Sequence, residues 1–208
     1  MRTDYLTVAR PASVEIEVKR SRFLCDVRRV GSEDAARAVV EAARKQHWDA
    51  RHHCSAFVLG PDAVVARSSD DGEPSGTAGA PMLEVLRGRE VSDVVAVVTR
   101  WFGGVLLGAG GLVRAYGDAV RAGLDEAGVR RRVLMSRFDL AASHADAARW
   151  EAELRSRDVT VLGADYAERV VLHVAVPSAT ADELAPLVAS MTGGSADLVP
   201  AGEDWVDT

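Results

Sequence analysis

Apolar residues occupy every second position over residues 14–18 and again over 23–27, on either side of the basic segment 19–22. A period of two with β-branched residues predicts two half-buried strands. Over 33–45 the apolar residues recur at spacings of three and four, which predicts a helix with one buried face. Ser32 is the expected N-cap of this helix, because its hydroxyl can accept a hydrogen bond from a free N–H group of the first turn.

A mixture of short strands and helices continues along the chain. Before residue 133 we predict strands at 53–60, 63–68 and 93–102, a loop at 69–81, and helices at 82–87 and 110–127. Beyond it we predict a strand at 136–143, a helix at 145–157, strands at 159–167 and 169–176, a helix at 180–191 and a strand at 196–201. This second order of elements is typical of the ferredoxin-like split βαβ arrangement. The predicted fold class is therefore α+β, with one domain over 1–132 and a ferredoxin-like (βαββαβ) domain over 133–208.

Charge separates the two predicted domains. The 208 residues carry a formal net charge of −6, with 27% charged residues and a mean hydropathy of −0.01. Residues 1–135 hold 20 Lys and Arg against 18 Asp and Glu, whereas residues 136–208 hold 5 against 13. The acidic balance argues against coating of nucleic acid by bulk electrostatics, and no DNA partner is expected. Any RNA is expected on the first domain only, because phosphate repels the acidic second domain.

Neither membrane insertion nor disulfide bonding is expected. The longest uncharged segment, 101–113, is interrupted by glycines and is shorter than the ~20 residues that a membrane helix needs. Residues 1–11 contain no apolar stretch of signal-peptide length. The two cysteines, Cys25 and Cys54, form no CxxC pair. These features predict a cytoplasmic protein with reduced thiols.

Four stretches carry more polar chemistry than a core and its turns require. The first, Lys19–Phe23, is by itself most simply a solvated hairpin turn. The second, Asp49–Cys54, places two histidines beside a cysteine, which suggests a metal. Adjacent residues on a strand face opposite sides, so His52 and His53 are poorly placed to share one ion. His52 and Cys54 could share one, but two ligands without a second cluster are a weak signal, and we expect no metal site. A Cys–His nucleophile pair is the other interpretation, but a thiol at the start of an apolar strand is usually unreactive.

The third and fourth stretches are loops, and each has two interpretations. Residues 69–79 combine carboxylates, hydroxyls and glycines, and form either an acidic surface turn or a binding loop. Residues 100–111 run from a predicted strand end into a helix start. Their glycines serve either tight packing of strand and helix or an anion cradle, to which Arg100 and Arg114 add charged donors. The cradle is not a Walker A loop, because no Gly-Lys-Ser/Thr follows.

Together, and in this order, the segments KRSRF, DARHHC, SDDGEPSGTAGAPM and TRWFGGVLLGAGGLVRAY closely resemble the Impact/YigZ-like protein family. The resemblance covers residues 15–125, with Trp101-Phe102 where paired tyrosines are common and Ser75 where alanine is frequent. It implies a ribosomal-protein-S5 domain-2-like fold for the first domain. It also implies a C-terminal domain similar to a ribosome-contacting domain of translocation elongation factors. Eukaryotic relatives regulate translation under amino-acid starvation through protein–protein contacts.

Two hypotheses of function follow. The first is a non-catalytic binding or regulatory protein, linked to translation or the stress response, that engages protein or structured RNA without a cofactor. The alternative is an enzyme for a phosphate-containing or nucleotide ligand, which uses the glycine-rich turn 103–111 and the acidic loop 70–77. In both cases the candidate residues are expected to surround one groove of the first domain. They are Arg20, Arg22, Arg51, His52, His53, Asp70, Asp71, Glu73, Ser75, Thr77, Arg100, Gly103, Gly104, Gly110, Gly111 and Arg114.

Overall fold

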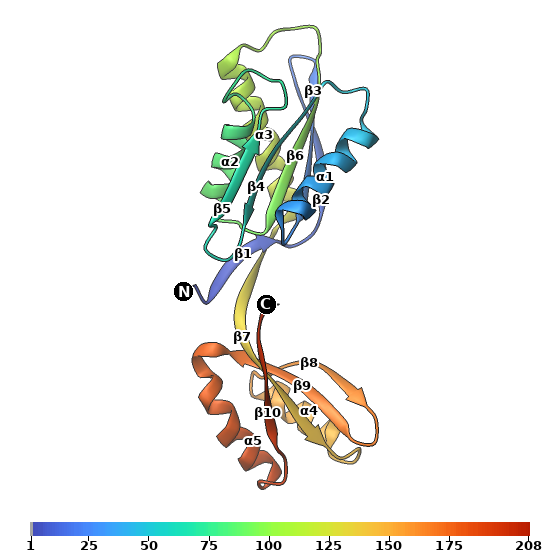
Figure 1. Cartoon of the computed structure of the whole chain (residues 1–208), viewed down its shortest axis with the longest axis vertical. Coiled ribbons are helices and arrows are strands. Elements are labelled where there is room, and N and C mark those ends of the chain that lie inside the picture. Colours follow the sequence, from blue (N-terminus) through green and yellow to red (C-terminus); the bar gives the residue numbers. More distant parts are fainter. Residues whose placement is uncertain (1) are drawn as a thin grey trace. The chain divides into compact units, whose positions relative to one another are not determined.

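The computed structural model describes residues 2–208, and the chain divides into two compact units, Met1–Arg131 and Arg132–Thr208 (Figure 1). Helices and strands occur in both units, so the predicted α+β class is confirmed. The elements of the first unit are β1 (Asp4–Val8), β2 (Ala12–Val18), β3 (Ser21–Arg29), α1 (Glu33–Gln46), β4 (His52–Leu59), β5 (Val65–Ser69), α2 (Gly79–Gly88), β6 (Val94–Trp101) and α3 (Ala109–Ala127).

An antiparallel sheet with strand order β2-β3-β6-β4-β5 is the centre of the first unit. Helices α2 and α3 cover one face, where Phe23, Val98 and Tyr116 belong to one buried cluster. Helix α1 covers the other face, where Ala36 packs with Val95 and Phe57. Because β4 and β6 are buried on both faces, residues 56–59 of β4 and 94–98 of β6 are continuous apolar runs rather than alternating ones.

Local signals explain how several of these elements begin. The Ser32 hydroxyl accepts a hydrogen bond from the Ala35 N–H at 3.1 Å, which confirms the predicted N-cap of α1. Helix α2 begins at Gly79 rather than at the predicted residue 82. Strand β1 was not expected from the pattern. It is held in the unit by a hydrogen bond from the Ser92 N–H to the Leu6 carbonyl at 2.8 Å, a partner far away in the sequence.

The second unit follows the predicted order of strand, helix, two strands, helix and strand. Its elements are β7 (Val129–Ala142), α4 (Ala147–Ser156), β8 (Thr160–Tyr166), β9 (Val170–Pro177), the 3-10 helix η1 (Ser178–Glu183), α5 (Leu184–Thr192) and β10 (Leu198–Asp207). Among the strands of this unit, β10 pairs with β7, β7 with β9 and β9 with β8, so their order is β10-β7-β9-β8, with antiparallel neighbours. Trp150 of α4 and Val188 of α5 pack with Leu172 of β9 in one buried cluster.

Three elements of the second unit differ clearly from the prediction. Strand β7 begins at Val129 rather than at residue 136. The helix expected over 180–191 is divided into η1 and α5, and Pro186 lies in the first turn of α5. Proline is tolerated there because an N–H group of the first turn has no partner within the helix. Strand β10 extends to Asp207 because it stays paired with β7 past an irregularity between Pro200 and Glu203. Among the described residues, no helix is both long enough and apolar enough to cross a membrane.

Candidate functional site

Asp70 holds the acidic loop 70–77 to the start of α2. Its Oδ1 accepts hydrogen bonds from the N–H groups of Ala78 at 3.0 Å and Gly79 at 2.8 Å. Its Oδ2 accepts from the Gly76 N–H at 2.8 Å. Partial burial opposes ionisation, but the hydrogen bonds from Gly76, Gly79 and Ala78 outweigh it and hold the pKa of Asp70 below its ordinary value. Asp70 therefore caps a helix that lacks a capping side chain at Ala78.

Replacing Asp70 by alanine is expected to lower the free energy of unfolding by about 1–2 kcal/mol, as for the loss of other N-caps. A carboxyl with a lowered pKa in the folded state stabilises the fold above its unfolded pKa, and this contribution is lost as the pH falls through the folded value. The difference in the free energy of unfolding between wild type and Asp70→Ala should thus stay constant from neutral pH down to about pH 4 and become smaller below it. Urea denaturation at a series of pH values measures it, with exposed Glu84→Ala as the control. A difference that persists unchanged at pH 2 contradicts the capping role.

Asp71 connects the same loop to α1 and β4. One carboxylate oxygen lies 2.6 Å from the Arg44 guanidinium, and the other accepts the backbone N–H of His53 at 2.7 Å. The Asp71 carbonyl lies 2.9 Å from Nδ1 of His52. Burial lowers the pKa of His53, although a hydrogen bond with the His47 carbonyl opposes this. His53 is therefore a neutral, buried side chain in a structural position.

Glu73 reaches into the core, where it meets β6 and α3. Its Oε1 lies 2.6 Å from the Arg100 guanidinium and accepts the Tyr116 hydroxyl at 2.7 Å. The side chains of Glu73 and Arg100 are only 4% and 8% exposed, so protein groups must replace the water that these charges would otherwise bind. The Arg100 guanidinium also lies 5.4 Å from the Phe23 ring centre. Arg100 is thus engaged inside the unit.

Cys54 and Tyr116 extend this polar network within the core. The Cys54 thiol donates to the Asp70 carbonyl at 3.0 Å, and its sulfur lies 3.4 Å from the Tyr116 hydroxyl. Burial raises the pKa of Cys54 to about 12 and raises that of Tyr116 well above its ordinary value. Both groups stay protonated at neutral pH, so the thiol is not an activated nucleophile. In the part of the chain that the structure describes, no three His, Cys, Asp or Glu side chains are grouped to hold a metal ion.

The hydroxyls of the acidic loop differ in exposure. Thr77 is buried, and its hydroxyl donates to the Pro74 carbonyl at 2.6 Å. Ser75 is exposed.

The carboxylates of Asp70, Asp71 and Glu73 point to three different parts of the unit, and each is already bound by protein groups.

The glycine-rich turn packs closely against the β2–β3 hairpin. The Gly103 N–H donates to the Ser21 hydroxyl at 3.1 Å, and a Cβ at Gly103 would lie 2.0 Å from the Arg20 carbonyl carbon. Gly104 has a φ of +83°, a conformation that suits glycine. At least one N–H group of the turn is therefore used for packing rather than for a ligand.

Gly110 and Gly111 lie in the first turn of α3, whose N-cap, Gly108, provides no side-chain hydrogen bond. Arg114 lies one turn further on and lines a cavity of about 350 Å³ between α2 and α3, together with Val85 and Arg121. The exposed start of α3 and the buried Arg100 are thus separate features: Arg100 is bound to Glu73, and Arg114 faces the α2–α3 cavity.

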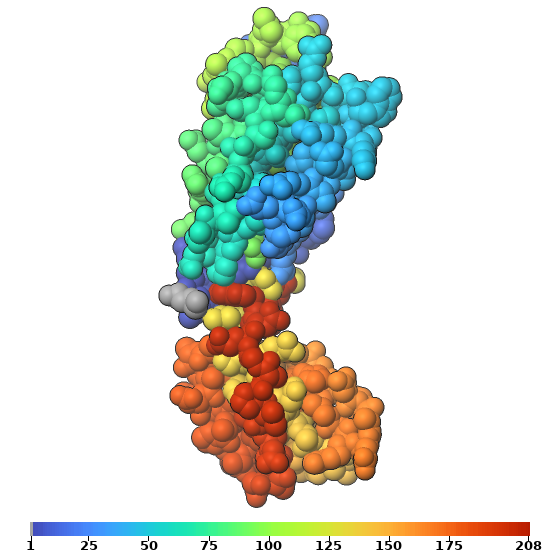
Figure 2. All heavy atoms as spheres, viewed as in Figure 1, coloured from blue at the N-terminus to red at the C-terminus, as the bar shows by residue number. Residues whose placement is uncertain are grey.

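Three segments of the first unit meet at one end, which we call the aromatic tip: residues 19–22, 47–51 and 101–107 (Figure 2). Trp101 joins them. Its Nε1 donates to Asp49 at 2.9 Å, and the Arg22 guanidinium lies 4.5 Å from its ring centre. Its ring also meets the His47 ring edge to face at 5.3 Å. Among the predicted site residues, the tip contains Arg20, Arg22, Arg51, Gly103 and Gly104.

Two important features were missed at the level of sequence. In the sequence, Tyr116 is one apolar position on a helix face. The structure shows in addition that its hydroxyl donates a hydrogen bond to Glu73. Trp48 and Leu106 are not singled out by the sequence pattern, and they are 82% and 84% exposed. Each lies in a turn next to basic residues or glycines, and that position was the available signal.

These observations define a two-domain α+β protein whose first domain combines an internally bound acidic loop with an exposed aromatic and basic end. Residues 19–124 match the Impact N-terminal domain, and residues 140–195 match a domain of unknown function, DUF1949. The chain belongs to the IMPACT family.

The similarity to bacterial relatives extends over most of the chain. The chain is 41% identical over 194 residues to the IMPACT family member YvyE of Bacillus subtilis, and the match covers 93% of this chain and 89% of that relative. It is 40% identical over 201 residues to YigZ of Escherichia coli, covering 96% and 98%. A solved structure described as a hypothetical protein is 40% identical, with a TM-score of 0.65, and the match covers 96% of this chain and 98% of that one. The Protein IMPACT homolog of Saccharomyces cerevisiae is 33% identical over 123 residues, covering 55% of this chain and 47% of that protein.

Proposed function

We propose that the chain is a non-catalytic binding protein, linked to translation or the stress response, whose first unit engages structured RNA or protein. One observation carries the proposal: the carboxylates of the acidic loop are bound by protein groups, whereas the aromatic tip exposes aromatic and basic side chains. General acid–base chemistry needs a titratable group within reach of a substrate, and the loop directs its carboxylates elsewhere. A binding role needs only the exposed surface.

The fold and the relatives support the cellular setting. The order β10-β7-β9-β8, with two helices packed on one face, supports the ferredoxin-like assignment of the second unit. The sheet of the first unit, with α2 and α3 on one face, is offered as the S5 domain-2-like fold that the family resemblance implies. The resemblance to eukaryotic regulators of translation supports a regulatory role, by analogy of fold.

The alternative, an enzyme for a phosphate-containing ligand, has one feature in its favour. The exposed start of α3 has no capping side chain and favours negative charge. Against it, Arg100 is paired with Glu73, and the Gly103 N–H is bonded to Ser21. The binding hypothesis is the one that the arrangement of charges favours.

The intact chain is expected to bind RNA with an affinity that falls steeply with salt, because each phosphate contact releases counterions. Replacing Arg20 by glutamine should reduce the slope of log Kd against log salt by about 1, since one contact is lost. Arg149→Gln is the matched control, because Arg149 is an exposed arginine of the acidic second unit. Fluorescence anisotropy over a salt series measures the Kd of the wild type and of both variants. Absence of binding at low salt refutes the RNA version and leaves a protein partner.

A further inference from the structure

We propose that the aromatic tip binds a single-stranded segment of RNA, with unpaired bases stacked on Trp48 and Phe102. This inference rests on the proposed function and specifies the form of RNA that the tip recognises. It is carried by the exposure and the charge of the tip.

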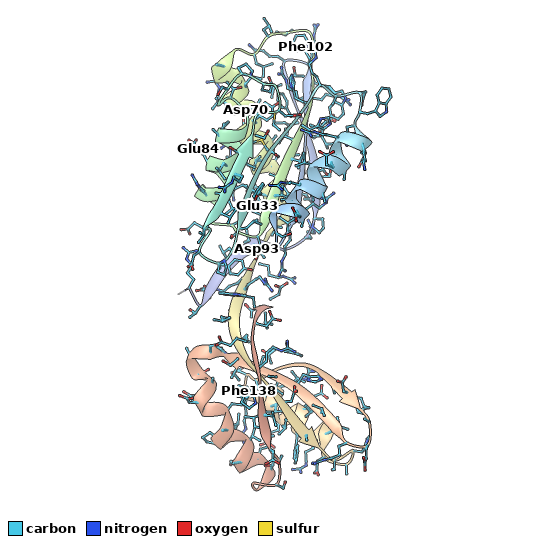
Figure 3. All side chains as sticks on the ribbon, viewed as in Figure 1. Glu33, Asp70, Glu84, Asp93, Phe102 and Phe138 are labelled. Atoms are coloured by element: carbon cyan, nitrogen blue, oxygen red, sulfur yellow. The ribbon has the colours of Figure 1, made fainter. Side chains whose placement is uncertain are left out.

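Two aromatic rings of the tip are open to solvent. Trp48 is 82% exposed and Phe102 is 57% exposed, and Figure 3 shows Phe102 on the loop that follows β6. Trp101 is engaged by Asp49, Arg22 and His47, and the Arg100 guanidinium lies 5.8 Å from the Phe102 ring centre. Large aromatic side chains normally contribute most of their area to a core or an interface. The exposed rings therefore point to a partner with flat apolar faces.

Neighbouring groups hold the two segments that carry the rings in place. The turn that carries Trp48 is held to Trp101 by the hydrogen bond from the indole to Asp49 and by the ring of His47. Phe102 follows Trp101 but lies on the other side of the end of β6, because adjacent residues of an extended chain face opposite sides. Gly103 then fixes this loop against the β2–β3 hairpin, where its backbone leaves no room for a Cβ. Each ring is thus carried by a segment held in place, which reduces the entropy lost on binding.

The charge around the rings suits a phosphate backbone. Lys19, Arg20 and Arg51 are exposed, and in the structure as described for residues 2–208 no carboxylate lies within ion-pair distance of them. Arg22 is partly engaged, 3.6 Å from Glu15. Basic side chains beside exposed aromatic rings are the combination that binds single-stranded nucleic acid.

An RNA duplex fits this surface less well than a single strand. The bases of a duplex are stacked on each other, and only unpaired bases present a face to a protein ring. A protein partner with an acidic surface would use the basic residues but would gain little from stacking. The exposed aromatic rings thus favour single-stranded RNA over both.

The test compares a 5′-labelled uridine RNA of about 12 nucleotides with a duplex of the same length, by fluorescence anisotropy on the full chain at low salt. We expect tighter binding of the single strand, and about tenfold weaker binding of it by Trp48→Ala and by Phe102→Ala. Trp48→Phe should retain most of the affinity because it keeps a ring. Leu106→Ala, which removes an exposed side chain without a ring, should weaken binding less. The thermal midpoint of each variant verifies folding.

The outcomes separate the two proposals. Equal affinity for duplex and single strand, or unchanged affinity in both ring variants, overturns the stacking inference and leaves RNA binding standing. Equal losses in Leu106→Ala and Trp48→Ala also overturn stacking, because they indicate a general apolar contact. No binding of either RNA refutes the inference together with the RNA version of the proposed function.

Discussion

Replacing Glu73 by alanine is expected to lower the free energy of unfolding by about 3–5 kcal/mol. The substitution leaves the Arg100 guanidinium inside the unit without its carboxylate, and Tyr116 without the acceptor of its hydroxyl. A buried charge that loses its partner is destabilised far more than an exposed one, because the protein excludes the water that would solvate it. This is the largest effect that a single substitution in the acidic loop should have.

Urea denaturation followed by circular dichroism measures the change, and Glu84→Ala on the exposed surface of α2 is the control, expected within about 0.5 kcal/mol of wild type. A double variant, Glu73→Leu with Arg100→Met, should be more stable than Glu73→Leu alone, because no buried charge remains unpaired. A loss below about 1 kcal/mol for Glu73→Ala would place the pair in the range of exposed ion pairs and refute its structural role.

Replacing Gly103 by alanine is expected to lower the free energy of unfolding by about 3 kcal/mol, at the upper end of overpacking effects. The new Cβ would lie 2.0 Å from the carbonyl carbon of Arg20 and 2.4 Å from the backbone nitrogen of Ser21. Backbone atoms of a paired strand cannot move aside as a flexible side chain can, so the hairpin or the loop must shift. The same shift disturbs the aromatic tip.

Gly110→Ala is the matched control for Gly103→Ala. Gly110 lies in the first turn of α3 with nothing within 4 Å of an added Cβ, and alanine favours the helix by up to about 1 kcal/mol. Thermal and urea unfolding of both variants should therefore move in opposite directions. A Gly103→Ala protein as stable as wild type would contradict the close packing of the turn.

Much of the fold could be predicted because its signals are local. The alternation over 14–18 and 23–27, the apolar run of β6 and the Ser32 cap each depend on neighbours in the sequence. Strand β1 could not be predicted in this way. Its hydrogen bond from Ser92 to Leu6 joins residues far apart in the sequence, and a strand of five residues carries little pattern of its own.

The sequence could predict which loop carries the candidate residues, but not where their side chains point. Composition indicates that loop 70–77 is unusual, yet nothing local tells that Glu73 turns inward to Arg100 while Asp71 turns to Arg44. Such directions depend on which strands the sheet brings beside the loop. The exposure of Trp48 could not be predicted for the same reason, because it depends on how the turn after α1 packs.

The acidic loop stabilises the fold, and binding is proposed for the aromatic tip. The most direct test measures single-stranded RNA affinity and the thermal midpoint together for Asp70→Ala and Arg51→Gln, at a temperature where both proteins are folded. We predict that Asp70→Ala lowers the midpoint and retains the affinity, while Arg51→Gln retains the midpoint and weakens the affinity. An Asp70→Ala protein that loses RNA binding at an unchanged midpoint, beside an Arg51→Gln protein that binds as wild type does, would contradict the account.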